Sequence, residues 1–286
     1  MNRSFVSDLL KRTGSWEPPG GCSTFVGHPQ LAYRNKVAVP VGIVMEHRFA
    51  FFHWIQYKQK VMCDGRAGAP SKDEEFTPPD LITMDWHDDC GAECDYDEGE
   101  LKRLDQHNEQ EVALFCWAGL RPLNDGHIAP AVWLNALGNV YIIQKQKNEY
   151  DCEGETCVVK DRYGNDHRIY YLRSPTELPE IYHETNSHTG VIWDLDLDYL
   201  TEEEEVPDQQ YTPMLSKRAI TSLLSPRKEW MQIILCDLKA ITIALEPEYT
   251  GGLSCSLELY RQWENIFFTA PLFSKDCDWK DNLFDG

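Results

Sequence analysis

The chain has 286 residues, and its hydrophobic fraction of 42% is enough for a large buried core. Its 47 acidic and 27 basic residues give a formal net charge of -20, which argues against nucleic acid as a partner because phosphate binding needs clustered Lys and Arg. The same charge would attract a cationic peptide.

The sequence also argues against a membrane partner or a secreted protein. No stretch is as long and apolar as a membrane span, and residues 1–14 are interrupted by charged side chains where a signal peptide would be apolar. Ten cysteines are scattered along the chain, and two of them, Cys116 and Cys236, lie in apolar runs where buried thiols are expected. We therefore expect a cytoplasmic protein with reduced cysteines.

Apolar runs alternate with stretches of helical or loop-like composition. We expect one catalytic domain over residues 1–286, with an N-terminal arm of about residues 1–36 that is rich in Gly, Pro and Ser. A helix is expected from residue 50, and residues 147–166 are read as a surface loop, with a hairpin as the alternative. The predicted strands cover residues 37–45, 81–86, 112–117, 140–144, 168–172, 191–197 and 240–245. This rhythm is typical of βαβ units and predicts an α/β fold with a mostly parallel sheet.

Acidic side chains gather at the ends of two predicted strands. Asp85-Trp86-His87-Asp88-Asp89 ends one apolar run, and Asp194-Leu195-Asp196-Leu197-Asp198 ends another. Side chains two apart on a strand share a face, so the acids of each cluster converge. Carboxylates buried this way repel one another unless cations neutralise them, and strand ends are where α/β sheets bind ligands. The pattern predicts a metal site, with manganese the natural match to carboxylate-rich ligands.

These motifs resemble the binuclear manganese signature of the ureohydrolases, the family of arginases and agmatinases. Asp-x-His-x-Asp, a later Asp-x-Asp and an earlier His at a strand end stand here in the family order. The local context looks like the branch that contains the peptide arginases, which convert arginine side chains of peptides into ornithine. The resemblance extends from about Val37 to Gly252. It implies an arginase/deacetylase-like three-layer αβα sandwich with a mostly parallel central sheet.

Carried over residue by residue, the resemblance implies a site with two Mn²⁺ ions. The matching ligand positions are His47, Asp85, His87, Asp89, Asp196 and Asp198. Asp194 stands where arginases usually have Ser, and we expect it to bind substrate together with Glu46, Asn124 and Glu246.

The resemblance also implies catalytic roles. Asp89 would shuttle the proton to the leaving amine, and His127, before an apolar run, is a candidate proton relay. Glu246 would clamp the guanidinium group at the end of the predicted strand 240–245, although Glu248 is a rival for this role. The expected partner is an arginine-containing precursor peptide.

Three alternative functions stay open from the sequence. One is a ureohydrolase of small molecules, and another is an amidohydrolase or deacetylase of the same fold. The third is a metal-free interaction protein that would use an aromatic surface at Trp16, Trp230, Trp263 and Trp279. The sequence does not fix the oligomeric state.

Overall fold

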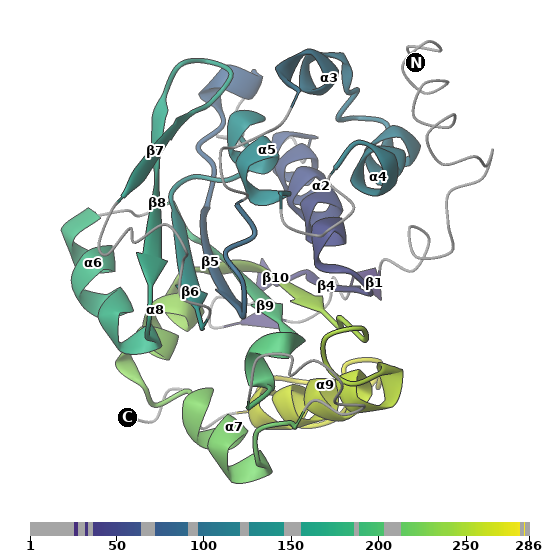
Figure 1. Cartoon of the computed structure of the whole chain (residues 1–286), viewed down its shortest axis with the longest axis vertical. Coiled ribbons are helices and arrows are strands. Elements are labelled where there is room, and N and C mark those ends of the chain that lie inside the picture. The colour runs from purple at the N-terminus through teal and green to yellow at the C-terminus, as the bar shows by residue number, and fades with distance from the viewer. Residues whose placement is uncertain are drawn as a thin grey trace.

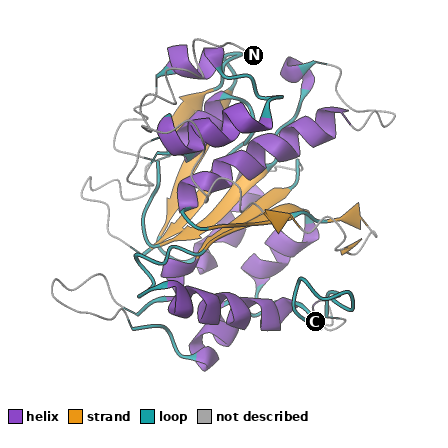
Figure 2. Ribbon diagram, turned by 90° about the vertical axis from the view of Figure 1, so that its right-hand side faces the viewer, coloured by secondary structure: helices purple, strands orange, loops and turns teal. Residues whose placement is uncertain are grey.

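The structure is a computed structural model that describes residues 26–27, 32–33, 37–63, 72–90, 97–120, 126–145, 156–185, 189–202, 213–280 and 283. Its centre is a sheet that lies between two layers of helices (Figures 1 and 2). The strands are β1 (Val26–Gly27), β2 (Ala32–Tyr33), β3 (Val37–Ala38), β4 (Val41–Val44), β5 (Asp80–Asp85), β6 (Val140–Gln144), β7 (Cys157–Lys160), β8 (Asp166–Leu172), β9 (Val191–Asp196) and β10 (Leu238–Ala244).

The helices of the two layers come from different parts of the chain. The first layer contains α2 (Ala50–Cys63), α3 (Glu98–Arg103), α4 (Glu109–Ala118) and α5 (Ile128–Trp133). The second contains α6 (Leu178–Thr185), α7 (Lys217–Leu223), α8 (Glu229–Cys236) and α9 (Leu253–Phe267). Short 3-10 helices are η2 (His47–Phe49), η3 (Asp73–Glu75), η4 (Pro175–Glu177) and η5 (Leu197–Leu200).

The main sheet has the order β1-β4-β10-β9-β5-β6-β8-β7. The six inner strands run parallel, and the short edge strands β1 and β7 pair antiparallel with their neighbours. β2 and β3 form a separate two-stranded sheet. The expected α/β class with a mostly parallel sheet is confirmed, and a topology of this kind brings the carboxyl ends of the inner strands to one edge.

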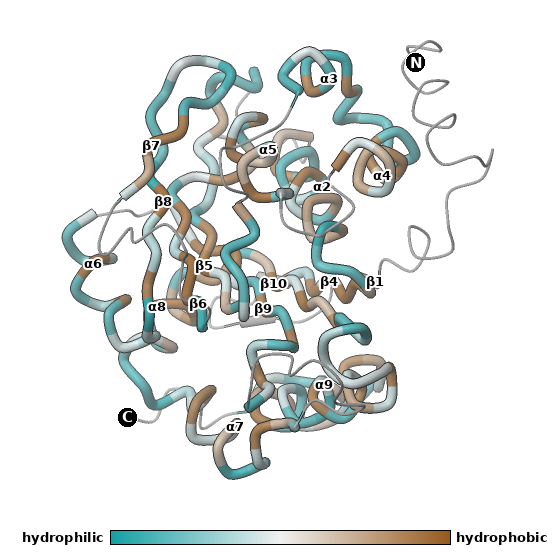
Figure 3. Tube along the Cα trace, viewed as in Figure 1, coloured by the Kyte–Doolittle hydropathy of each residue, from teal (hydrophilic) through white to brown (hydrophobic). Residues whose placement is uncertain are grey.

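Alternating side chains of the inner strands build two cores. On β5, Leu81 packs with the layer of α2 to α5, whereas Ile82 and Met84 pack with the layer of α6 to α9. β6 alternates in the same way, with Val140 on the first side and Tyr141 on the second. The inner strands are therefore largely apolar on both faces, and much of their trace is brown, the colour of hydrophobic residues, in Figure 3.

Two sequence predictions were wrong for the described residues. Residues 112–117 lie in α4, because Asn108 caps the helix by accepting a hydrogen bond from the amide of Glu111, and a short apolar run fits a buried helix as well as a strand. The segment read as a surface loop contains β7, which pairs with β8 as a hairpin. Residues 147–155 of that segment lie outside the described residues.

Burial corrects two further expectations. Cys236 is exposed at the end of α8, although Cys116 is buried as predicted, and the described cysteines are free thiols. The expected aromatic surface is absent at the described positions, because Trp230, Trp263 and Trp279 are buried in the core between the sheet and the layer of α6 to α9. Trp16 lies outside the described residues. Within the described part of the chain, no helix has the length and apolar character needed to span a membrane.

Candidate metal centre

Four neighbouring strands bring acidic and imidazole side chains to one edge of the sheet. β4 leads into His47, β5 and β9 end at Asp85 and Asp196, and β10 leads into Glu246. These strands are adjacent and parallel in the order β4-β10-β9-β5, so their carboxyl ends meet. All four side chains are buried.

The Nδ1 atom of His47 is surrounded by carboxylates. It lies 2.9 Å from Oδ2 of Asp85, 2.6 Å from Oδ2 of Asp89 and 3.3 Å from Oδ2 of Asp196. Neither this nitrogen nor Oδ2 of Asp85 forms a contact with hydrogen-bond geometry, although nearly all buried polar atoms in proteins do. One imidazole nitrogen facing three carboxylate oxygens is a donor set for a divalent cation, so these residues fit a metal ion.

A second half of the centre lies around His87. Its Nδ1 atom is 3.6 Å from Oδ1 of Asp85 and 3.4 Å from Oδ2 of Asp198, and its side chain is 39% exposed. Asp85 therefore faces His47 with one oxygen and His87 with the other. The donor atoms form a buried group and a more exposed group, with Asp85 between them.

Backbone amides fix the orientation of three of these carboxylates. The amide of His87 donates to Oδ1 of Asp85 at 2.8 Å, and that of Trp86 donates to Oδ1 of Asp198 at 3.1 Å. The amide of Asp198 donates to Oδ1 of Asp196 at 3.0 Å. In both Asp196 and Asp198 the other oxygen, Oδ2, is the one that contacts a histidine.

The pKa values show how unfavourable this crowding is without a cation. Burial, and then the charge of Asp85, holds the pKa of Asp89 well above its usual range. Burial, and then the charges of Asp198 and Asp85, does the same to the pKa of Asp196. Burial acts to raise the pKa of Asp85, but the close contacts with His47 and His87 outweigh it and hold that pKa below its usual range. The fold therefore brings together buried carboxylates whose negative charges repel one another.

Asp194, expected to bind substrate, lies on the opposite side of the His47 ring from the other acids. Its Oδ2 atom is 2.6 Å from Nε2 of His47 and accepts a hydrogen bond of 2.8 Å from the hydroxyl of Thr83. Its Oδ1 atom accepts a hydrogen bond from the hydroxyl of Thr242. Asp194 is fully buried, and its described partners are the side chains of His47, Thr83 and Thr242.

His127, the expected proton relay, is fully buried at the start of α5. Its Nδ1 atom lies 3.7 Å from Oδ2 of Asp89, and its ring stands edge-on to that of His47 at 4.5 Å between centroids. On its other side it stacks on Trp54 at 5.3 Å. His47, Asp89 and His127 are close enough to hold one ion together, so His127 is also a candidate ligand.

The acids expected to bind substrate differ in exposure. Glu246 is buried and accepts a hydrogen bond from the backbone amide of His47, and burial raises its pKa to about 8. Its rival Glu248 is exposed. Glu46 is 43% exposed and forms an ion pair of 2.5 Å with Arg48. Asn124 lies outside the described residues.

Two acidic residues of the centre have left-handed backbone conformations. The φ angle is 46° at Asp89 and 38° at Glu246, although neither residue is glycine. Such a conformation costs about 1–3 kcal/mol and persists where the surrounding structure holds it, often at a functional site. Here it turns the chain sharply at the ends of two strands, where the side chains reach the centre.

The sequence analysis missed several polar residues near the centre. Thr83 and Thr242 are polar positions inside the apolar runs of β5 and β10, on the face of Asp194, and that position was the available signal. Lys145 follows β6 and lies 4.8 Å from the ring centroids of both Trp86 and Tyr199. Burial lowers its pKa to about 8, against the charges of Asp198 and Glu202. No motif marked Lys145.

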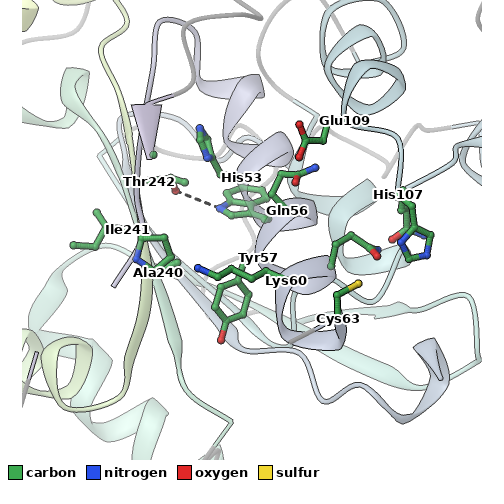
Figure 4. Close-up of a pocket in the computed structure, with 15 residues that line it drawn as sticks. His53, Gln56, Tyr57, Lys60, Cys63, His107, Glu109, Ala240, Ile241 and Thr242 are labelled. Carbon is green, nitrogen blue, oxygen red and sulfur yellow. Dashed lines mark hydrogen bonds between the residues drawn. The ribbon is translucent and has the colours of Figure 1, made fainter. Parts of the chain in front are cut away.

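A separate cavity of about 450 Å³ lies between α2, the start of α4 and the strands β4 and β10 (Figure 4). Its lining includes His53, Tyr57 and Lys60, and it contains none of the predicted metal ligands. Burial lowers the pKa of His53 to about 4. Two residues of its lining also contact residues near the metal centre. Trp54 stacks on His127, and Thr242 donates a hydrogen bond to Asp194.

The sequence and the fold were compared with those of known proteins. No protein-family model and no curated protein matches it. Among solved structures it is similar to a proclavaminate amidino hydrolase from Streptomyces clavuligerus, with 13% sequence identity and a TM-score of 0.35. The match covers 78% of this chain and 62% of that one, so the chain spans less than two thirds of that enzyme's length. A similarity of this size says nothing about activity.

Proposed function

We propose that the protein is a binuclear-metal hydrolase that acts on the guanidinium group of arginine residues in a peptide and gives ornithine and urea. The observation that carries this proposal is the buried contact of His47 Nδ1 with the carboxylates of Asp85, Asp89 and Asp196. The motif resemblance to ureohydrolases agrees with it. Manganese is the proposed metal, because most of the donor atoms are carboxylate oxygens.

The donor atoms would hold two ions, one in each half of the centre. His47, Asp89 and Asp196 would hold the buried ion, and His87 and Asp198 the more exposed one. Asp85 faces both histidines and would contribute one oxygen to each half of the centre. The four aspartates formally balance two divalent charges. When bound, such a pair of ions lowers the pKa of a shared water and supplies a nucleophile at neutral pH.

Further acids would make the site selective for a cation. Asp194 and Glu246 are two acidic side chains beyond the four ligand carboxylates, and both are buried. A guanidinium group is planar, always charged and suited to paired hydrogen bonds with a carboxylate. Glu246 follows β10 at the same edge of the sheet, next to the backbone of His47, and would bind that group at the centre.

Proton transfer would use Asp89 and His127. Attack of water on the guanidinium carbon would form a C–O bond and pass a proton of the water to Asp89, and departure of the ornithine side-chain nitrogen would break a C–N bond. That nitrogen needs a proton as it leaves, and Asp89 would deliver it. Nδ1 of His127 is 3.7 Å from Oδ2 of Asp89 and would exchange protons with Asp89 between turnovers.

Two observations favour a peptide over a free amino acid as substrate. The net charge of -20 attracts a cationic chain. The exposed half of the centre carries His87, whose ring meets that of Tyr249 edge-on at 5.8 Å, so an aromatic side chain flanks the solvent-facing donor atoms. An arginine side chain could enter there while its backbone stays outside.

The test is incubation of manganese-loaded protein with arginine-containing peptides, free arginine, agmatine and an acetyl-lysine peptide. We expect urea release and a loss of about 42 Da per converted arginine, the mass difference between a guanidinium and an amine. Conversion of free arginine or agmatine alone would favour the small-molecule ureohydrolase, and deacetylation alone would favour the amidohydrolase. Asp196→Asn is the inactive control.

A further inference from the structure

Thr83, Asp194 and Thr242 form a row across three neighbouring strands. In the sheet register Asp194 of β9 pairs with Thr83 of β5 on one side and with Thr242 of β10 on the other. Paired residues of parallel strands present their side chains on the same face, so the two hydroxyl groups flank the carboxylate. Both hydroxyls donate hydrogen bonds to it.

The direction of these hydrogen bonds follows from the chemistry of their partners. The indole nitrogen of Trp54 only donates, and it lies 3.2 Å from the hydroxyl oxygen of Thr242 (Figure 4). Thr242 therefore accepts from Trp54 and uses its own proton for Asp194. Thr83 donates its proton to the other carboxylate oxygen at 2.8 Å. The acid is thus supported from both sides and oriented toward the ring of His47.

The contact between Asp194 and His47 decides where the ring proton lies. An ionised carboxylate only accepts hydrogen bonds, so the proton of a neutral His47 ring must lie on Nε2, 2.6 Å from Oδ2 of Asp194. Nδ1 then carries the lone pair, and Nδ1 is the atom that faces Asp85, Asp89 and Asp196. The chain Trp54, Thr242, Asp194, His47 ends at the donor atoms of the metal centre.

We propose that Asp194 is a positioning residue that fixes His47 in its Nε2-protonated form and so directs the lone pair of Nδ1 at a divalent cation. The role rests on the cation-binding part of the proposed function and reassigns Asp194 from the substrate contact expected from the sequence. A carboxylate behind a histidine ligand also increases the basicity of the ligand.

The experiment compares Asp194→Asn with two variants of Thr242. Asparagine keeps the shape of the side chain but turns one acceptor into a donor, so it cannot accept from Thr83, Thr242 and His47 together. We expect its Mn²⁺ dissociation constant to rise about 10- to 100-fold. Thr242→Val removes one donor and should weaken Mn²⁺ binding less. Thr242→Ser keeps the hydroxyl group and should bind like the wild type.

A spectroscopic readout separates positioning from a general loss of structure. In protein loaded with diamagnetic Zn²⁺ and labelled with ¹⁵N-histidine, the His47 ring of the wild type should show a protonated Nε2 and a metal-bound Nδ1. A wild-type ring with its proton on Nδ1 would overturn the inference. So would an Asp194→Asn variant with unchanged ring signals and unchanged Mn²⁺ affinity. A wild type that binds neither ion would instead defeat the proposed function, and with it this role of Asp194.

Discussion

Oδ2 of Asp89 lies 2.6 Å from Nδ1 of His47, closer than two lone pairs can approach unless a proton or a metal ion neutralises the contact. Both groups are buried, so solvent does not screen them. Protons and cations therefore compete for the same donor atoms, and this competition gives the first prediction.

The stabilisation by Mn²⁺ should grow as the pH rises from 5 to 8. The pKa values of Asp89 and Asp196 are raised in the folded state, so protons stabilise the metal-free fold at low pH, and this contribution is lost as the pH rises toward those folded-state values. Bound Mn²⁺ takes the place of these protons, so the metal-loaded protein does not lose this stability as the pH rises. Thermal unfolding with Mn²⁺ and with a chelator measures the difference, and a gap that narrows with rising pH would contradict the expectation.

Asp196→Asn should affect the metal-free and metal-loaded protein in opposite directions. The substitution removes an acid whose ionisation is opposed by burial and by the charges of Asp198 and Asp85, so the variant should unfold at a higher temperature than the wild type in the presence of a chelator. It also removes a ligand, so Mn²⁺ should no longer raise that temperature. Exposed Asp166→Asn is the control, and it should change neither measurement. Equal destabilisation of both forms would show that Asp196 is a structural residue.

Glu246→Gln should lower kcat/KM for an arginine-containing peptide about 10- to 150-fold, because a hydrogen bond to a charged group contributes about 1.5–3 kcal/mol. Glutamine can still accept the hydrogen bond from the amide of His47, so the backbone contact is kept. The exposed Glu248→Gln should stay within about twofold of the wild type, the size expected for a weak surface charge effect. A larger loss of kcat/KM in Glu248→Gln than in Glu246→Gln would indicate that Glu248 binds the guanidinium group.

Asp73→Asn should destabilise the protein by about 1–3 kcal/mol, because it removes the charged partner of a buried amine. Nζ of Lys58 lies 2.5 Å from Asp73 and also donates to the carbonyl of Leu134 at 2.6 Å. Lys58 is fully buried, whereas Asp73 is partly exposed. Urea unfolding measures the change, and the exposed Glu74→Gln should cost less than about 0.5 kcal/mol. An equal loss of stability in the two variants would show that the contact between Lys58 and Asp73 contributes no more than a surface charge.

His53 should make the protein less stable in mild acid. Its folded-state pKa is about 4 against an unfolded value of 6.5, so its contribution to stability is complete above pH 6.5 and is lost as the pH falls toward 4. At pH 5 the loss is up to about 2 kcal/mol. The difference in unfolding free energy between wild type and His53→Gln should shift by that amount between pH 7 and pH 5. A constant difference would mean that His53 is accessible to protons in the folded state.

Local patterns were sufficient to predict most of the sheet. The apolar runs before Asp85 and Asp196 are strands, because each is short and buried on both faces. The run at residues 112–117 is also short and apolar but follows Asn108, which caps a helix. A short apolar run does not by itself distinguish the two structures, and the cap was the deciding local signal.

The centre could be predicted only as far as its motifs reach. Spacing placed the acids of each strand on one face, and the structure brings the six expected ligand positions to one edge of the sheet. The neighbours of Asp194 depend on the register of three strands that are far apart in the sequence, and no local pattern contains that register. The expected roles of these residues stay predictions until they are measured.

The most direct test of the account is the metal content of the purified protein after expression with added manganese, measured by elemental mass spectrometry. We predict close to two divalent ions per chain, as two-ion hydrolytic sites require, and a clear reduction in Asp196→Asn. Wild-type protein that carries no stoichiometric metal and binds no Mn²⁺ in titration would contradict the account.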